Sequence, residues 1–399
     1  MKHKALIVGR IAALLGILQM LCGCWDRTEI NDMALVTAAA IDKDERDGIE
    51  LSLQVFMPRA LGSNSGGSQG GGGQKLTLVR SSRGQNIADA VSKIQTKLPR
   101  KVFWGHCKVF VLGEEFARKG VREEMDFLAR HPQPRERAYM FVSKGKAIET
   151  LNLLPPLERY SADMMRKLSE LKIGLKVTMK DFIIMLGGDS KAAALPMLDI
   201  LPPEEGEQPS QGVPYIAGTA VFKEDKLIGD ITLQTTRGVL WLTKKMEKAT
   251  ITVRPKDAKS GFITINPNHH VIHQTPRIVN GKWQVLLSIQ TSGDLVQNGT
   301  NWDPMNLDLL HAMEAAVQDS IKDKIELALD EVQKTMKADI LGFAEDFHRS
   351  YPRQWGRVKN RWDEVYPTIQ VKTDIHVNIR RPGLSTVPVA IPEDEVKKK

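Results

Sequence analysis

The 399-residue chain has few cysteines, few aromatic residues and no strong excess of either charge. The three cysteines lie at positions 22, 24 and 107, and the formal charge is +8. Hydrophobic residues make up 42% and charged residues 26%, without collagen-like periodicity, which excludes wholesale disorder and fibrous structure. At roughly 100 to 200 residues per domain, the length predicts two or three globular domains.

A bilayer-spanning apolar run is missing near the N-terminus, where a shorter one is present. Residues 11–21 form an apolar run of about 11 residues, whereas a transmembrane helix needs roughly 20, which weighs against a permanent span. Three basic residues and no acid precede this run, and residues 1–23 therefore have the layout of a secretion signal.

The signal ends in Leu21-Cys22-Gly23-Cys24, which resembles the bacterial lipobox. In that motif a Leu three positions before the Cys and a small residue directly before it precede lipidation and cleavage. Cleavage between Gly23 and Cys24 would make Cys24 the mature N-terminus, although Cys22 replaces the usual Ala or Ser. The alternative is an ordinary secretion signal or a short anchor. The sequence Trp-Asp-Arg at 25–27 is a poor continuation of either one.

Lipidation of Cys24 would have physical consequences for the whole chain. A diacylglyceryl thioether supplies two acyl chains at roughly 0.8 kcal/mol per buried methylene, enough for stable anchoring outside the cytoplasmic membrane. Cys107 would then have no partner, so no internal disulfide forms. Removing the signal also removes three positive charges, and the remaining charge of +5 suits an anionic lipid surface rather than nucleic acid.

Apolar periodicity predicts a mixed α/β domain over residues 24–205. The expected strands are 33–41, 49–56, 75–79, 102–112 and 139–142, and the expected helices are 86–98, 113–130 and 147–154, followed by a helical stretch through 186. The glycine-rich segment 62–73 reads as a flexible hairpin tip, because no Gly-Lys-Ser/Thr ends it as in a phosphate loop. The Pro- and Glu-rich segment 202–212 is the expected domain boundary.

The second domain, residues 206–385, is predicted to be rich in β-structure and to end in a long helix. Short strands are expected at 216–222, 226–233, 249–253, 261–265, 269–273 and 283–291. Asp303-Pro304 predicts the start of an amphipathic helix over 304–340, and a last strand at 368–379 precedes a charged tail, 386–399. The expected fold class is α+β, with antiparallel or mixed sheets and one long C-terminal amphipathic helix.

Residues that could carry chemistry are sparse. His269 and His273 could share a strand face, but His270 could not, and no nearby Cys completes a zinc set. Cys107 has no activating partner in its neighbourhood and is expected to be buried. Serine nucleophile elbows, His-Glu-x-x-His and dinucleotide glycine patterns are absent. We therefore expect no catalytic, cofactor-binding or metal-binding residues.

Aromatic and basic residues gather after the long helix. Tyr351, Trp355 and Trp362 alternate with several arginines and lysines. Stacking on nucleic acid would suit such a pattern, but the expected extracytoplasmic location disfavours it. These aromatic residues are expected to pack the helix end or to contact a protein partner.

Several segments resemble the Ger(x)C family, the lipoprotein C subunits of nutrient germinant receptors in endospore-forming bacteria. Cys24-Trp25-Asp26-Arg27 resembles the family's mature N-terminus, and the resemblance covers essentially the whole chain. Further matching segments follow in order: 40–42, 104–108, 113–117, 126–130, 218–222, 338–343, 351–355 and Trp362. The departures are Cys22 and the long glycine-rich tip.

The resemblance implies a non-enzymatic lipoprotein on the outer face of the spore's inner membrane. Its lipid anchor, with fatty acyl chains such as palmitate, would be at Cys24, and its partners would be the A and B membrane subunits of a germinant receptor. Trp25, Asp26 and Arg27, with Tyr351, Trp355 and Trp362, would be contact residues. A solute-binding lipoprotein of a transporter remains the alternative, which calorimetry with amino acids and sugars would separate; an extracytoplasmic hydrolase would need a converging catalytic set.

Overall fold

The computed structural model describes residues 29–57, 76–206, 208–248 and 250–381, together with Ile7, Arg10, Pro392, Val396 and Lys397. The predictions for Gly23, Cys24, Trp25, Asp26 and Arg27 lie outside these residues, as do the glycine-rich segment 62–73 and most of the charged tail. Their outcome therefore stays a prediction.

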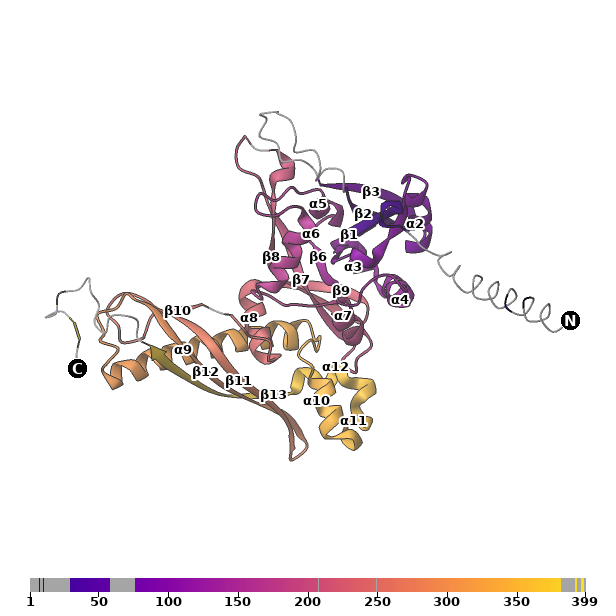
Figure 1. Ribbon diagram of the computed structural model, residues 1–399. Coiled ribbons are helices and arrows are strands. Elements are labelled where there is room, and N and C mark those ends of the chain that lie inside the picture. Colours follow the sequence, from indigo (N-terminus) through magenta and orange to yellow (C-terminus); the bar gives the residue numbers. More distant parts are fainter. Residues whose placement is uncertain are drawn as a thin grey trace.

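A nine-stranded mixed sheet forms the larger part of the fold (Figure 1). Its order is β3-β2-β1-β5-β6-β7-β8-β9, and the short β4 also pairs with β1. The strands are β1 (Met33–Lys43), β2 (Ile49–Phe56), β3 (Thr77–Gly84), β4 (Lys101–Phe103), β5 (Val109–Gly113), β6 (Tyr139–Ser143), β7 (Ala192–Leu201), β8 (Val213–Lys223) and β9 (Lys226–Thr232). The central strands β1, β5, β6 and β7 run parallel, and the outer pairs are antiparallel.

Both faces of this sheet are covered, which explains why its central strands are apolar without alternation. In β1, Ala39 and Ile41 belong to one core, whereas Ala38 and Ala40 belong to the other. The helices are α2 (Ile87–Gln95), α3 (Glu114–Lys119), α4 (Arg122–Arg130) and α7 (Met179–Leu186) on the first core, and α5 (Ala147–Leu151) and α6 (Ser161–Glu170) on the second.

A four-stranded sheet extends from the first as an elongated arm (Figure 1). Its strands are β10 (Ile251–Val253), β11 (Ile263–Val279), β12 (Lys282–Asn298) and β13 (Gln370–Arg381), in that order. The hairpin between β11 and β12 turns at Asn280 and Gly281, both with positive φ, as an Asn-Gly turn requires. The long helix α9 (Leu307–Ala328) lies against this sheet and buries a single stripe of side chains: Leu309, Met313, Val317, Ile321, Ile325 and Ala328.

Helix α8 (Leu233–Leu242) joins the two sheets by packing on α9. The contact is close at Gly238, where a Cβ would lie 2.0 Å from the Lys324 carbonyl oxygen and 2.7 Å from the Ala328 Cβ. Glycine is therefore the residue that this helix crossing requires. Three short helices, α10 (Phe343–Ser350), α11 (Pro352–Val358) and α12 (Trp362–Val365), complete the C-terminal part.

The structure confirms the α+β class with mixed sheets, but the long helix differs from its prediction. It begins at Leu307 rather than 304, because Asn306, not Asp303, accepts the hydrogen bond from the Leu309 N–H. Its regular part ends at Ala328, and a π-helical segment, Leu329–Thr335, continues it. Residues 336–340 are not helical.

Other local predictions were also corrected. Segment 102–112 is not one strand, because the turn Trp104–His106 separates β4 from β5. Segment 113–130 is two helices that part at Gly120, whose φ is +129°.

The expected boundary at 202–212 connects two paired strands, β7 and β8, so the first sheet continues beyond residue 206. The division into domains at that position therefore stays a proposal based on sequence.

Candidate functional site

The predicted contact aromatics form a cluster around α10 to α12. Trp355 and Trp362 are 3% and 5% exposed, so their indoles belong to the core and cannot be offered to a partner. Their ring centroids lie 4.9 Å apart, edge to face. Tyr351 is half-buried and packs on the Phe347 ring at 6.3 Å. The burial of both tryptophans supports core packing, which is one of the two roles predicted for these residues.

A buried carboxylate, Asp339, organises this aromatic cluster. It accepts hydrogen bonds from the Phe343 and Ala344 N–H groups at 3.1 and 2.8 Å, and from Trp362 Nε1 at 3.0 Å. Burial raises the pKa of Asp339 to about 7, although all three donors oppose this shift. Because the amides belong to the first turn of α10, Asp339 fixes the start of that helix.

Asp42 has the same role in the first sheet. Its carboxylate accepts from the Ala147 and Ile148 N–H groups at 2.7 and 3.0 Å, at the start of α5. A Cβ on Gly113 would lie 2.2 Å from Asp42 Oδ1, so glycine is needed beside this carboxylate. Two segments that resemble the family, 40–42 and 113–117, therefore meet at a structural contact.

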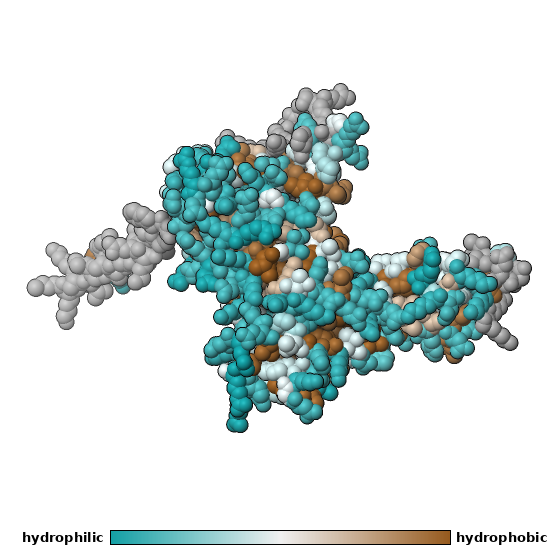
Figure 2. All heavy atoms as spheres, turned by 180° about the vertical axis from the view of Figure 1, so that it is seen from behind, coloured by the Kyte–Doolittle hydropathy of each residue, from teal (hydrophilic) through white to brown (hydrophobic). Residues whose placement is uncertain are grey.

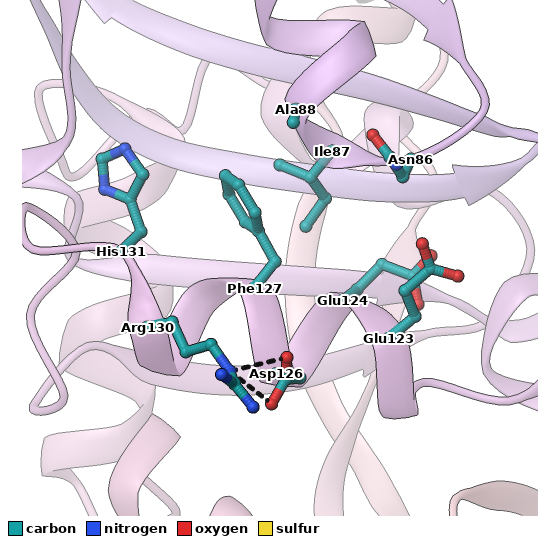
Figure 3. A pocket seen from close by; sticks show the side chains of 9 residues that line it. All are labelled: Asn86, Ile87, Ala88, Glu123, Glu124, Asp126, Phe127, Arg130 and His131. Atoms are coloured by element: carbon teal, nitrogen blue, oxygen red, sulfur yellow. Dashed lines mark hydrogen bonds and ion pairs between the residues drawn. The ribbon is translucent and has the colours of Figure 1, made fainter.

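A surface hollow of about 350 Å³ lies between the start of α2 and α4 (Figure 3). Ile87 and Ala88 of α2 face Phe127 of α4 and form its apolar side. Charged groups of α4 surround them. The complete lining is Asn86, Ile87, Ala88, Glu123, Glu124, Asp126, Phe127, Arg130 and His131.

The charged groups of this hollow are held by their own helix. Arg130 Nε pairs with Asp126 at 2.9 Å, an i,i+4 contact (Figure 3). Burial raises the pKa of Glu124 and lowers that of His131. The lining contains no serine, threonine or cysteine, so it offers no nucleophile for a carboxylate or imidazole to activate. Its acidic and apolar groups suit contact with an apolar or basic polypeptide segment.

A second hollow of about 570 Å³ adjoins the first, because Ala88 and His131 line both. Its walls include Val91 and Gln95 of α2 and the buried Trp104, whose backbone N–H donates to Gln133 Oε1 at 3.2 Å. Sequence reasoning did not predict this surface, since residues 86–104 and 123–133 carry no joint pattern. Its signal in the sequence was indirect: segments 104–108 and 126–130 both resemble the family.

The cysteine and histidines that could carry thiol or metal chemistry lie outside the hollow between α2 and α4. Cys107 is buried, as expected, and burial raises its pKa to about 12. His269 and His273 are exposed on β11, whereas His270 packs edge to face on Trp241 and bonds Thr291 Oγ1 at 2.9 Å. Within the described ranges, no group of three or more His, Cys, Asp or Glu side chains could hold a metal ion.

Hydrophilic residues dominate the rear surface of the molecule, with scattered apolar patches between them (Figure 2). In the part of the chain that the structure describes, no helix is both long and apolar enough to cross a membrane. Fold and surface together define a multi-sheet α+β protein with open hollows on its larger sheet.

Comparison with known proteins identifies the family. The N-terminal domain of spore germination proteins matches residues 26–200, and the spore germination B3/GerAC-like C-terminal domain matches residues 217–383. YfkR of Bacillus subtilis (strain 168) is 30% identical over 370 residues, covering 92% of this chain and 94% of the relative. Spore germination protein KC of the same organism is 26% identical and covers 98% of both chains. The chain belongs to the Ger(x)C family of spore germination proteins.

A solved structure supports the same fold. The crystal structure of the GerBC protein superposes with a TM-score of 0.56 over 86% of this chain and 96% of that chain, at 20% sequence identity. The relatives agree in having a germination role, and this chain is a spore germination protein by membership of their family.

Proposed function

We propose that this protein is the lipid-anchored, non-catalytic C subunit of a nutrient germinant receptor, needed for assembly of the receptor and for nutrient-triggered germination. The observation that carries the proposal is the family match over 26–200 and 217–383, which begins two residues after the lipobox cysteine. An anchor at Cys24 would leave all strands of both sheets outside the membrane. The A and B membrane subunits would be its partners, and the spore inner membrane its location.

The surface supports a contact role more than a chemical one. The hollow between α2 and α4 is open and amphipathic, and its lining holds acidic groups but no serine, threonine or cysteine. The buried carboxylates Asp42 and Asp339 accept backbone hydrogen bonds at helix starts and are not directed at a hollow. The non-catalytic assignment predicts no turnover by the purified mature protein on peptide, glycan or lipid substrates.

Spores test the receptor role directly. Strains with a deletion, or with Cys24→Ala, should lose dipicolinate release in response to a subset of amino acids and sugars, and should respond normally to a non-nutrient trigger. A wild-type response to every nutrient, in a strain without other family members, would contradict the proposal.

The mass of the mature protein tests the anchor separately. The expected mass includes a diacylglyceryl group on Cys24 and lacks residues 1–23. A mature mass without this group would exclude lipidation, whatever the germination result.

A further inference from the structure

Near the start of β1 lie basic side chains that form no ion pair with the acidic side chains the structure describes. Met33, the first residue of β1, pairs with Lys101 of β4 in parallel register. Arg100 precedes Lys101, and Arg135 and Arg137 precede β6, so all four lie where strands that run parallel to β1 begin. We call these four residues, Arg100, Lys101, Arg135 and Arg137, the basic edge. Among the described residues, none of the four forms an ion pair with an acidic side chain.

The four residues of the basic edge line three surface hollows. Arg100 lines one of about 370 Å³, together with Phe56, Met57, Leu98 and Pro99. Lys101 lines the hollow beside Trp104 and Gln133. Arg135 and Arg137 line a third, of about 350 Å³, with His106 and Tyr139. The surface thus combines unpaired cations with an apolar patch.

The unpaired basic residues of this region outnumber its exposed acidic residues. Glu29, Asp32 and Glu136 are exposed near the same end of the sheet. Lys176, whose Nζ lies 5.6 Å from the centre of the Tyr139 ring, adds a fifth cation. Two other basic residues that line the third hollow are already neutralised: Lys108 pairs with Asp163 at 2.7 Å, and Arg166 with Glu170 at 2.6 Å.

The length of chain before the fold limits how far this surface can lie from an anchor. Cys24 lies only six positions before Ile30, where the described 3₁₀ turn before β1 begins. Six residues span at most about 20 Å. If Cys24 is acylated, as the proposed function requires, the start of β1 and the cations around it lie within that distance of the lipid surface.

We propose that the basic edge docks on the anionic phospholipid headgroups of the membrane that holds the anchor. Three observations carry this proposal: the unpaired cations, the apolar residues beside Arg100, and the short chain between Cys24 and Ile30. Lys and Arg near an anionic surface each contribute binding that decays within a Debye length. Leu98 and Pro99 line the same hollow as Arg100. These apolar side chains would enter the headgroup layer when the cations dock. Docking would fix the orientation of the larger sheet relative to the membrane and leave the second sheet free for partners.

Vesicle binding by the chain without acylation tests the docking independently of the anchor. The protein is residues 24–399 with Cys24→Ser, and the probes are vesicles of phosphatidylcholine with and without phosphatidylglycerol. Binding is expected only with phosphatidylglycerol and should weaken as salt increases. R100Q/K101Q and R135Q/R137Q should each lower the partition coefficient roughly 20- to 30-fold, from about fivefold per cation.

A matched control removes the same charge elsewhere. Arg353 and Arg357 are exposed on α11 and have no ion pair among the described residues, so R353Q/R357Q should bind as the parent does. Equal binding by all three variants, or no binding to phosphatidylglycerol vesicles, would overturn the proposal. Unchanged circular dichroism of each variant shows that the fold is retained.

Placement of a fluorophore on the acylated protein gives a second, geometric readout. A label at His106→Cys should be quenched by brominated lipid, whereas a label at Gly281→Cys in the hairpin of the second sheet should not. Equal quenching at both positions would contradict docking by the basic edge. Neither experiment depends on germination, and absence of the diacylglyceryl mass would count against the anchor alone.

Discussion

At the scale of single residues, two buried carboxylates fix the starts of helices, one far from its carboxylate in sequence and one directly after it. Asp42 accepts from α5 across more than a hundred residues, and Asp339 accepts from α10 and from the Trp362 indole. Both lie in segments that resemble the family, 40–42 and 338–343. The role of both segments is therefore to stabilise the fold, since neither carboxylate lines one of the described surface hollows.

Loss of the Asp42 carboxylate should destabilise the larger sheet. Asp42→Ala leaves two amide donors at the start of α5 without acceptors, and we expect the free energy of unfolding to fall by roughly 1 to 3 kcal/mol. Urea unfolding measures the change. Asp374→Ala is the matched control, because Asp374 is 56% exposed and pairs only at the surface with His376; an equal loss in both variants would contradict the capping role.

Asp339 should make stability depend on pH. Its folded-state pKa of about 7 lies above the ordinary 3.8, so the folded chain holds this proton more tightly than the unfolded chain. The resulting stabilisation is complete below the ordinary pKa and is lost as pH rises through about 7, at about 1.4 kcal/mol per pKa unit. Asp339→Asn does not titrate, so the wild type should lose stability relative to this variant between those limits. Parallel pH curves from urea unfolding would contradict the assignment.

At the scale of elements, sequence periodicity predicted those whose apolar residues alternate along a strand or follow one face of a helix. Strand β2 has the predicted bounds, and α2 was predicted within a few residues because Asn86 caps it. Strand β7 was missed, since a strand buried on both faces lacks alternation. Helix α8 was missed because Thr, Gly and Val in its sequence lower its helix propensity, and no structure was predicted for residues 234–248. The hairpin β11–β12 was predicted as separate short strands, partly because a bulge at Pro267–His269 interrupts its register.

The candidate surfaces could not be predicted in this way. The hollow of Figure 3 joins residues 86–88 to 123–131, and the basic edge joins residues 100–101 to 135–137. Each arises from parallel strand order, which brings distant loops to one end of a sheet and leaves no local pattern in the chain. The burial of Trp355 and Trp362 likewise depends on α10 and Asp339 rather than on their own neighbours in sequence.

The crossing of α8 and α9 should tolerate no side chain at Gly238. Gly238→Ala would place a Cβ 2.0 Å from the Lys324 carbonyl oxygen, so the helices must separate, and we expect a loss of roughly 1 to 3 kcal/mol in the free energy of unfolding. Gly356→Ala is the control, because its Cβ would meet nothing within 4 Å on α11. That change should be neutral or stabilising by up to about 1 kcal/mol. Equal effects in thermal or urea unfolding would contradict the close crossing.

At the scale of the whole molecule, the two sheets are held together by the chain that links them and by noncovalent contacts between the described residues. Helix α8 packs on α9, and α10 meets the turn after α7, where His348 Nδ1 lies 2.6 Å from Asp189 Oδ2 and Glu345 accepts from the Ser190 N–H at 3.1 Å. These contacts place the second sheet beside the first without a disulfide, consistent with a single buried thiol at Cys107. The reaction rate of that thiol can therefore report on global unfolding.

Cys107 should react only when the larger sheet opens. Its thiol is buried and its pKa is raised to about 12, so the reactive thiolate is rare at neutral pH. In residues 24–399 with Cys24→Ser, the reaction with a disulfide reagent should be very slow in buffer and should accelerate with urea in parallel with global unfolding. Gly238→Ala should also accelerate it if the α8–α9 contact stabilises the whole chain. The exposed neighbour supplies the control: His106→Cys should add one fast thiol and leave Cys107 slow. Rapid reaction of Cys107 in buffer, or a rate that urea does not change, would show that the strand start at Val109 opens locally and does not report on the molecule as a whole.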